Sequence, residues 1–162
     1  MNIFIEEHQQ LVEDLLAEGI EFILIGGYAV NFHGYNRTTG DLDIWIKPDN
    51  ENKDRILKFF KKSGFDDDSI SHIAKLDFMQ ATVFSIGDEP FKTDFLTKVS
   101  GVTYEEADKE KILFYHEGIS IPFINLNHLV LTKIGTGRGK DKTDIEMLQE
   151  VRKVKNQTGP LE

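Results

Sequence analysis

The sequence predicts a mixed α/β (α+β) fold, in which a β-sheet carries helices mainly on one face and the chain ends in a helical segment. Three observations predict it. Apolar side chains recur at helical spacing over residues 3–18. Short apolar runs of strand length follow at 21–26 and 41–47. Helical periodicity then returns over residues 141–155, close to the end of the chain.

Glycine and proline mark most boundaries in the first half of the chain. Gly19 is a natural stop for the first helix, and Pro48 ends a strand because proline has no backbone donor. A continuous apolar run such as 21–26 is typical of a buried strand. The predicted elements are a helix over 3–18, a strand over 21–26, a short helix over 27–34 that ends at Gly34, a polar loop over 35–40, and a strand over 41–47.

Capping and turn residues organise the second half. Asn50 is the predicted N-cap of a helix, and the run Asp66–Asp68 is predicted to be a solvated loop. Gly87-Asp88-Glu89-Pro90 is typical of a hairpin turn. The predicted elements are a helix over 51–63 that ends at Gly64, a hairpin of strands 77–86 and 91–97, a short helical turn over 103–110, a second hairpin of strands 112–115 and 119–123, a helix from Asn125 to about residue 135, and a last helix over 141–155 with Asp141 as its cap.

Length and composition indicate one globular domain. The chain has 162 residues, of which 40% are hydrophobic and 29% are charged, which suits a single packed core. We expect one domain over residues 1–155 and a frayed tail over 156–162. No apolar run approaches the ~20 residues of a membrane span, and the N-terminus lacks the basic segment of a signal peptide. With no cysteine in the chain, these features predict a cytoplasmic protein without disulfides, thiolate metal sites or membrane contact.

The net charge of −9, from 19 basic and 28 acidic residues, argues against a broad nucleic-acid-binding surface. Nucleotide binding stays open, because a bound divalent metal ion reverses the local field. The densest basic cluster lies near the C-terminus, and a local positive field of this kind suits a triphosphate. Its members are Lys133, Arg138, Lys140 and Lys142.

The segment 24–46 combines a glycine turn with paired acids. Gly26 and Gly27 follow an apolar strand, and their bare backbone amides can approach a phosphate closely. Asp41 and Asp43 are two residues apart in the next strand, so both side chains point to one face, about 7 Å apart. Two such carboxylates repel each other unless a cation lies between them. The alternative is a pair of acids on the solvent face of a strand.

This segment resembles the nucleotidyltransferase superfamily of polymerase-β-like fold, whose pattern is a Gly-Gly or Gly-Ser turn, a spacer, and Asp-x-Asp between apolar residues. Residues 37–43, Arg-Thr-Thr-Gly-Asp-Leu-Asp, look like the form found in the minimal bacterial branch that includes the AbiEii-type toxins. Lys133 and residues 137–144 resemble the distal basic-acidic motif of that branch. The similarity covers roughly residues 20–150.

The resemblance implies a site with two Mg²⁺ ions, Mn²⁺ being the alternative ion. Asp41 and Asp43 would bind both ions, and a third acid on a later strand would bind one and act as the general base. Asp94 is the predicted third acid because it lies within an apolar strand. Asp77 and Asp88 are competing candidates for this role.

Further residues are predicted to bind the nucleotide. The resemblance implies that the glycine turn and the basic cluster hold the phosphates, that Arg37 clamps a phosphate or an acid, and that Thr39 orients Asp41. The alternatives are an exposed loop arginine and solvated lysines, with Asp144 in the first turn of the last helix against its dipole. The predicted nucleotide-binding residues are Gly26, Gly27, Arg37, Thr39, Lys133, Arg138 and Lys140.

Together these features predict a Mg²⁺-dependent enzyme that transfers NMP from a nucleoside triphosphate to an acceptor hydroxyl and releases pyrophosphate. The acceptor is open between tRNA, a protein and a small molecule, and the resemblance adds a toxin–antitoxin role with an antitoxin-like partner. The alternative is a non-catalytic module that binds nucleotide or a partner on the same fold. We expect His33 to be structural, and the aromatic residues Phe32, Tyr28 and Tyr35 either to stack on a base or to belong to the core.

Overall fold

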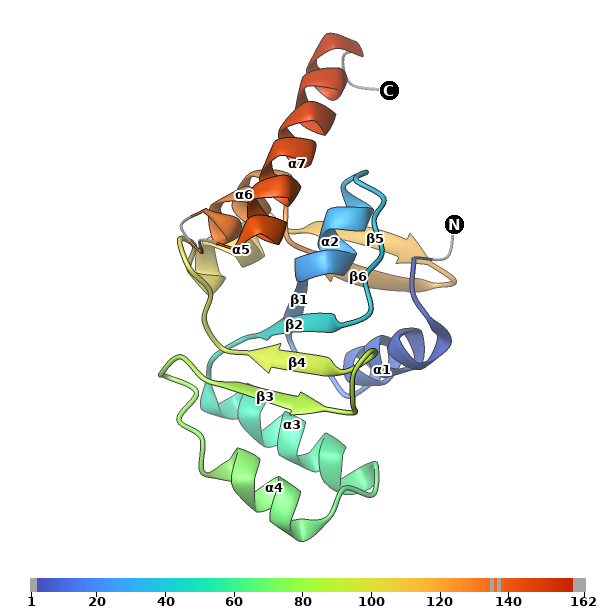
Figure 1. The fold of residues 1–162 in the computed structure, drawn as a ribbon. Coiled ribbons are helices and arrows are strands. Elements are labelled where there is room, and N and C mark those ends of the chain that lie inside the picture. Colours follow the sequence, from blue (N-terminus) through green and yellow to red (C-terminus); the bar gives the residue numbers. More distant parts are fainter. Residues whose placement is uncertain (1–2, 135, 137, 159–162) are drawn as a thin grey trace.

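The computed structural model describes residues 3–134, 136 and 138–158. These residues form one six-stranded mixed sheet in the order β3-β4-β2-β1-β6-β5, with seven helices around it (Figure 1). This confirms the predicted fold class. The strands are β1 (Phe22–Ile25), β2 (Leu42–Ile46), β3 (Val83–Ile86), β4 (Thr93–Leu96), β5 (Ile112–His116) and β6 (Ile119–Phe123). The helices are α1 (Glu6–Ala17), α2 (Gly26–Phe32), α3 (Asn50–Lys62), α4 (Asp67–Ala74), α5 (Tyr104–Lys109), α6 (Leu126–Lys133) and α7 (Gly139–Thr158).

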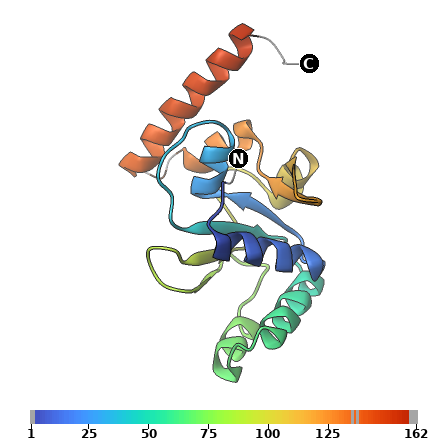
Figure 2. The ribbon, with the colours of Figure 1, turned by 90° about the vertical axis from the view of Figure 1, so that its right-hand side faces the viewer.

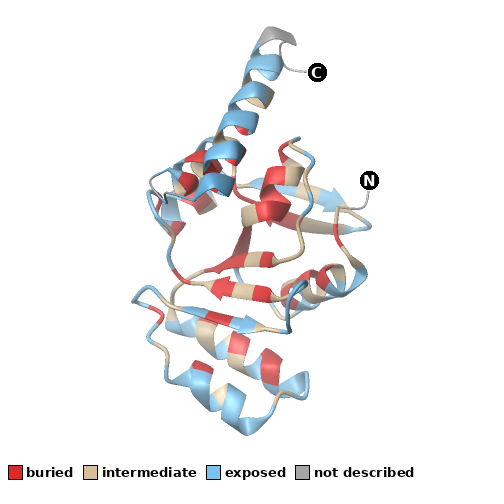
Figure 3. Ribbon diagram, in the orientation of Figure 1, coloured by how far each residue is buried: buried red, intermediate tan, exposed pale blue. Residues whose placement is uncertain are grey.

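A large part of the core lies between the sheet and the helices α1 and α3, which lie together on one face of the sheet (Figure 2). Phe60 of α3 packs its ring against Phe84 of β3 and Phe95 of β4. All four residues of β1 are buried, as the continuous apolar run predicts. Buried residues follow the inner strands and the sides of the helices that face them (Figure 3). Burial of these large apolar side chains is the main stabilising contribution to the fold.

The opposite face of the sheet carries the acids. Side chains alternate along a strand, so Asp43 and Trp45 of β2 share this face, while Ile44 points to the helical core. Trp45 packs its ring edge-on against Tyr104 of α5, with 5.4 Å between the ring centroids. Helix α5 therefore covers one end of this face, and the end that carries Asp43 is left open to a cleft.

Strand pairing fixes the position of the third acid. The predicted hairpin of β3 and β4 forms, and β4 then pairs in parallel with β2, so that Asp43 lies directly opposite Asp94. Strand β3 begins at Val83 and not at residue 77, because Asp77 closes a turn, its carboxylate accepting a bond from the Met79 amide. The second predicted hairpin forms between β5 and β6.

Two helix starts differ from the prediction. Asp49, and not Asn50, is the N-cap of α3, and its side chain accepts from the Asn52 amide at 2.8 Å. The predicted loop at Asp66–Asp68 is instead the start of α4, because the Asp66 side chain accepts from the Ser69 amide and caps the helix. Carboxylates in a first turn also interact favourably with the helix dipole.

The last helix is longer than predicted. Helix α7 begins at Gly139 and projects from the body of the molecule (Figure 1). Asp141 therefore lies inside the first turn, so its predicted role as the cap is wrong. Residues 156–158, predicted as part of the tail, are helical, and 159–162 lie outside the described residues, as do residues 135 and 137 of the predicted helix end and distal motif. None of the helices in the described part of the chain has the length and apolarity needed to span a bilayer.

Candidate active site

Three carboxylates converge where β2 and β4 begin. Asp43 and Asp94 are directly opposite on adjacent strands, and such strands are about 4.8 Å apart. Asp41 comes two residues before Asp43. Burial, and then the charges of Asp94 and Asp41, raise the pKa of Asp43 to about 6, while Lys140 and Lys133 act in the opposite direction. At Asp43, burial and the two neighbouring carboxylates therefore outweigh the positive charges.

The acid cluster supplies the donors that a magnesium ion requires. Asp41 Oδ1 is buried and accepts no hydrogen bond, which is costly for a carboxylate unless a cation compensates it. In the described residues, no three His, Cys, Asp or Glu side chains are gathered closely enough to enclose an ion by themselves. Mg²⁺ is commonly held by one or two carboxylates, with water and substrate phosphates completing its shell. The residues thus fit an ion that takes part of its ligands from the substrate.

The glycine turn is shaped around the acids. Gly26 has a φ of +66°, and a Cβ atom there would lie 2.0 Å from Asp43 Oδ2. A Cβ atom on Gly27 would lie 2.2 Å from Thr39 Oγ1. Only glycine allows the turn to approach Asp43 and the loop this closely. The turn and the carboxylate therefore form one tightly fitted unit.

These groups line a cleft of about 910 Å³ on the open face of the sheet. All ten residues predicted from the sequence as catalytic, metal-binding or nucleotide-binding contribute to its lining. They are Gly26, Gly27, Arg37, Thr39, Asp41, Asp43, Asp94, Lys133, Arg138 and Lys140. The volume is within the range of 300–1,000 Å³ typical of small-ligand sites, so the cleft can hold a nucleotide.

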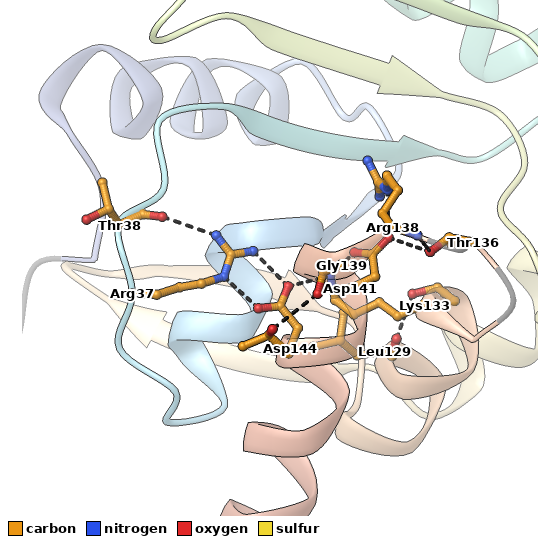
Figure 4. A network of polar contacts seen from close by, with 11 residues as sticks. Arg37, Thr38, Leu129, Lys133, Thr136, Arg138, Gly139, Asp141 and Asp144 are labelled. Carbon is orange, nitrogen blue, oxygen red and sulfur yellow. Dashed lines mark hydrogen bonds and ion pairs between the residues drawn. The ribbon is translucent and has the colours of Figure 1, made fainter.

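The start of α7 is tied to this cleft by buried ion pairs (Figure 4). Arg37 donates to both carboxylate oxygens of Asp144, at 2.8 and 2.9 Å. Lys133 Nζ lies 3.0 Å from Asp144 and 3.2 Å from Asp141, and its side chain is only 8% exposed. Arg37 is thus not an exposed loop residue and Lys133 is not solvated, as the alternative interpretation supposed. Both cations are already neutralised by helix α7.

Asp141 has a structural role different from capping. Its carboxylate accepts from Arg138 at 2.7 Å and from Thr136 at 2.8 Å (Figure 4). Burial by itself would raise the pKa of Asp141, but these hydrogen bonds and the charge of Lys133 outweigh burial and lower it. Lys140, in contrast, is exposed and makes no ion pair or hydrogen bond among the described contacts. Its ammonium group is available to a ligand in the cleft.

Comparison with known proteins identifies the family. The family model described as "Nucleotidyl transferase of unknown function (DUF2204)" matches residues 4–160. The chain belongs to this family. It is a nucleotidyltransferase, as the sequence pattern predicts, whereas the AbiEii-type branch stays a prediction. Among curated protein sequences, none matches the chain.

Solved structures of nucleotidyltransferases share the fold. The lincosamide antibiotic adenylyltransferase LnuA, solved with lincomycin bound, superposes with a TM-score of 0.56 at 12% identity, over 93% of this chain and 99% of that one. A protein from Thermotoga maritima assigned as a nucleotidyltransferase gives 0.55 at 13% identity, over 95% and 96%. A nucleotidyltransferase-like antigen from Paracoccidioides brasiliensis gives 0.50 at 16% identity, over 90% and 73%. At these identities the likeness concerns the fold alone.

The structure adds polar residues to the family site that the sequence analysis missed. Ser85 of β3 donates a hydrogen bond to Asp94 Oδ1, and Lys92 Nζ lies 3.6 Å from the same oxygen. The strand register places Ser85 opposite Asp94, whereas counting outward from the predicted turn at 87–90 would have placed it opposite Lys92. Asp144 is the third addition, because it joins Arg37 to Lys133. From its position in the sequence, Asp144 is predicted only to be an acid in the first turn of the last helix.

Other candidates lie away from the cleft or take part in packing. Asp77 and Asp88 do not line it. His33 is buried and its Nε2 contacts the Ile124 carbonyl at 2.7 Å, and burial lowers its pKa. The Phe32 ring stacks on Phe123, and Tyr28 is buried in the core. Thr39 donates weakly to the Asp41 carbonyl, at 3.4 Å, and not to the carboxylate.

Proposed function

We propose that this nucleotidyltransferase binds a nucleoside triphosphate with Mg²⁺ and transfers NMP to an acceptor hydroxyl. The observation that carries the proposal is the convergence of Asp41, Asp43 and Asp94 beside the glycine turn, with Asp41 Oδ1 buried and unpartnered. Such a cluster is unfavourable by itself and becomes favourable when cations and phosphates fill the cleft. Asp41, Asp43 and Asp94 would hold two ions, and the bound metal supplies charge neutralisation at the reacting phosphate.

The chain's own groups have distinct tasks in this reaction. The acceptor oxygen forms a bond to the α-phosphorus as the bond to the β-phosphate oxygen breaks, and pyrophosphate leaves. Asp94, oriented by Ser85, takes the proton of the acceptor hydroxyl. The amides of Gly26 and Gly27 and the ammonium of Lys140 position the phosphates. Catalysis then consists mainly of positioning and charge stabilisation.

Arg37 and Lys133 contribute differently from what the resemblance implies. Their hydrogen-bonding groups are engaged by Asp141 and Asp144, so they act mainly by holding α7 against the cleft. Arg138 is exposed at its far end and pairs with Asp141 on one side. Of the basic cluster, Lys140 therefore stands first as a direct phosphate ligand.

A small molecule is the acceptor class that the molecule supports best. The net charge of −9 disfavours the broad phosphate contacts that RNA needs. The fold neighbour LnuA is an adenylyltransferase of lincosamide antibiotics, and ATP is the donor we would test first. A toxin–antitoxin role and an antitoxin-like partner rest on the sequence resemblance, and a cytoplasmic location rests on the composition; all three remain predictions.

Calorimetric titration tests the proposal. ATP, GTP, CTP and UTP are titrated into the protein with and without Mg²⁺, beside an Asp41→Asn/Asp43→Asn variant. We expect one nucleotide to bind only with Mg²⁺, and the variant to lose that binding. A wild-type protein that binds no nucleotide in the presence of Mg²⁺ and candidate acceptors would contradict the proposal.

A further inference from the structure

A second cleft, of about 670 Å³, lies on the same face of the sheet at the far ends of β2 and β4. Its floor is apolar and rigid. Trp45 is 1% exposed and packs edge-on against Tyr104, and its indole nitrogen donates to the Thr97 carbonyl at 3.0 Å. Val102 adds a further apolar side chain to the lining. The hollow is therefore preformed by residues that the core and a hydrogen bond hold in place.

The second cleft adjoins the cleft of the three acids. Lys98 and Val99 line both. Asp43 and Trp45 are two residues apart on β2, so both face the same side of the sheet, and their partners on β4 are Asp94 and Leu96. The two clefts thus follow one another along this face, and Asp43 and Trp45 are about 7 Å apart along the strand.

Asp43 and Asp94 lie between the glycine turn and the second cleft. Strand β1 runs antiparallel to β2 with Ile25 opposite Asp43, so Gly26 lies at the start of β2, whereas the second cleft lies at its end. In phosphoryl transfer the attacking and leaving oxygens are roughly in line on opposite sides of the phosphorus. If pyrophosphate leaves toward Gly26 and Gly27, the acceptor must approach from the opposite side.

We infer that the second cleft, floored by Trp45, Val102 and Tyr104, is the acceptor-binding site. The inference rests on the proposed function and adds the place and the chemical class of the acceptor. The acceptor lies with an apolar surface on the lining of this cleft and directs a hydroxyl toward Asp94. Lys98, at the junction of the two clefts, lies beside the path between them.

The lining selects the chemistry of the acceptor. The rim carries three carboxylates, and each is paired with a lysine: Asp49 with Lys47 at 3.7 Å, Glu105 with Lys109 at 3.4 Å and Asp108 with Lys111 at 2.6 Å. A rim of balanced charge lacks the strong positive field that a phosphate-rich molecule needs. The volume and the apolar floor match a drug-sized organic molecule. The site therefore takes an uncharged small molecule with an apolar face and a free hydroxyl, and not an RNA end.

Trp45 provides a direct test because it is the only tryptophan in the chain. The ¹⁵N-labelled full chain, with Mg²⁺ and a non-hydrolysable ATP analogue, is screened by NMR against hydroxyl-bearing fragments and lincomycin. We expect the binders to shift the single indole N–H signal and the amides of Val99 and Val102. Absence of binders, or binders that leave these signals unchanged, would overturn the inference.

Matched variants then test the acceptor role with the best transfer substrate among the binders. Val102→Phe narrows the cleft and should raise the acceptor KM about tenfold or more, equivalent to ~1.4 kcal/mol, with the nucleotide Kd unchanged. Val83→Phe, on the exposed edge strand β3, is its control. Glu105→Arg reverses a rim charge and keeps the test open if Val102→Phe does not fold, and Glu150→Arg on α7 is its control.

The outcomes separate this inference from the proposed function. If the protein binds nucleotide only with Mg²⁺ and neither cleft variant changes the acceptor KM, the inference is overturned and the proposed function stands. Fragments that occupy the cleft in a protein that binds no nucleotide overturn the proposed function, and with it the acceptor role of this cleft. A raised acceptor KM with unchanged nucleotide Kd in the variants supports both.

Discussion

At the scale of single residues, the site is held in an electrostatically unfavourable state. Asp43 is partly buried next to two other carboxylates, and its pKa of about 6 measures the free energy that its ionisation costs the folded protein. Asp94 is satisfied by Ser85 and Lys92, whereas Asp41 keeps a buried oxygen without a partner. Such unfavourable electrostatics are typical of functional sites, and removal of one charge should reduce the repulsion.

The substitution Asp43→Asn should stabilise the protein and abolish transfer. The shift of the Asp43 pKa from 3.8 to about 6 corresponds to at most about 3 kcal/mol of unfolding free energy at pH 7. Each kcal/mol raises the melting temperature of a protein of this size by roughly 2–4 °C. An amide cannot replace the charge that a metal ion needs. Thermal unfolding in EDTA and a nucleotidyl-transfer assay measure the two effects.

Asp88→Asn is the matched control for this change. Asp88 is exposed and lies outside the cleft, so the melting temperature and the transfer rate should both stay at the wild-type value. Transfer at the wild-type rate by Asp43→Asn would remove Asp43 from the site. Loss of transfer by Asp88→Asn would restore Asp88 as the third acid.

Gly26→Ala should disrupt the acid cluster beyond its backbone cost. An alanine Cβ would lie 2.0 Å from Asp43 Oδ2, and the φ of +66° adds strain, which for a left-handed residue is about 1–2 kcal/mol. Gly19→Ala isolates the backbone cost, because Gly19 has a φ of +71° with nothing within 4 Å. Denaturant unfolding should show the larger loss for Gly26→Ala, and calorimetry should show that only this variant loses Mg²⁺-dependent nucleotide binding. Equal losses of stability would mean that the contact with Asp43 has no energetic weight.

At the scale of secondary-structure elements, most of the architecture was predictable because apolar periodicity and glycine or proline boundaries are local signals. Both hairpins, the buried β1 and the helix from Asn125 follow from such signals. One error occurs where adjacent residues compete for one role. Asp49 and Asn50 are both good caps, and the cap is Asp49, which accepts from the Asn52 amide. The Asn52 side chain is bound to the Glu21 and Lys47 carbonyls, and a local pattern does not report such contacts.

The candidate site was predictable to a similar degree. The acids and glycines follow from a motif of fixed spacing, and the structure places them in one cleft. The roles of Arg37 and Lys133 could not be predicted, because Asp144 is 107 residues from Arg37 in the chain. A charge in a sequence shows no partner, so a phosphate ligand and a buried ion pair look alike until the tertiary contacts are known.

The two lysines of the distal motif should therefore respond differently to the same substitution. Lys133→Met leaves two buried carboxylates short of a partner and should cost about 3–5 kcal/mol of stability, as the loss of one member of a buried pair does. Lys140 is exposed, so Lys140→Met should stay within about 0.5 kcal/mol of wild type. Chemical denaturation measures both values.

Nucleotide affinity completes the comparison of the two lysines. Lys140→Met should raise the Kd of the Mg²⁺–nucleotide complex about tenfold, equivalent to ~1.4 kcal/mol, through loss of one phosphate contact. An unchanged Kd in Lys140→Met would assign the phosphates to other residues. A Lys133→Met variant as stable as wild type would show that the buried network does not secure α7.

At the scale of the whole molecule, charge distribution matters more than net charge. The chain carries −9 in total, yet one cleft brings acids and cations together. The carboxylates of β2 and β4 lie on one side of it and the start of α7 lies on the other. The sheet topology creates this arrangement by placing β4 beside β2. The free energy of unfolding should therefore change with pH as the charged groups of the cleft gain or lose protons.

The unfolding free energy in EDTA should show this dependence when wild type is compared with Asp43→Asn. Between pH 4 and 6 the native Asp43, with its pKa of about 6, keeps a proton that the unfolded chain releases. The native state thus binds more protons, and stability falls as pH rises through this window. The lowered pKa values of His33 and Asp141 give the opposite trend, but both groups are present in both proteins and cancel in the difference.

Urea unfolding followed by Trp45 fluorescence at pH 4 to 8 measures that difference. We expect the two proteins to be similar near pH 4 and the variant to be more stable above pH 6, by at most about 3 kcal/mol. Mg²⁺ with nucleotide should reverse the order at pH 7, because a ligand that binds only the native wild type stabilises it by mass action. A difference that does not vary with pH would show that Asp43 ionises as freely in the folded protein as in the unfolded chain, and that the carboxylates do not repel one another.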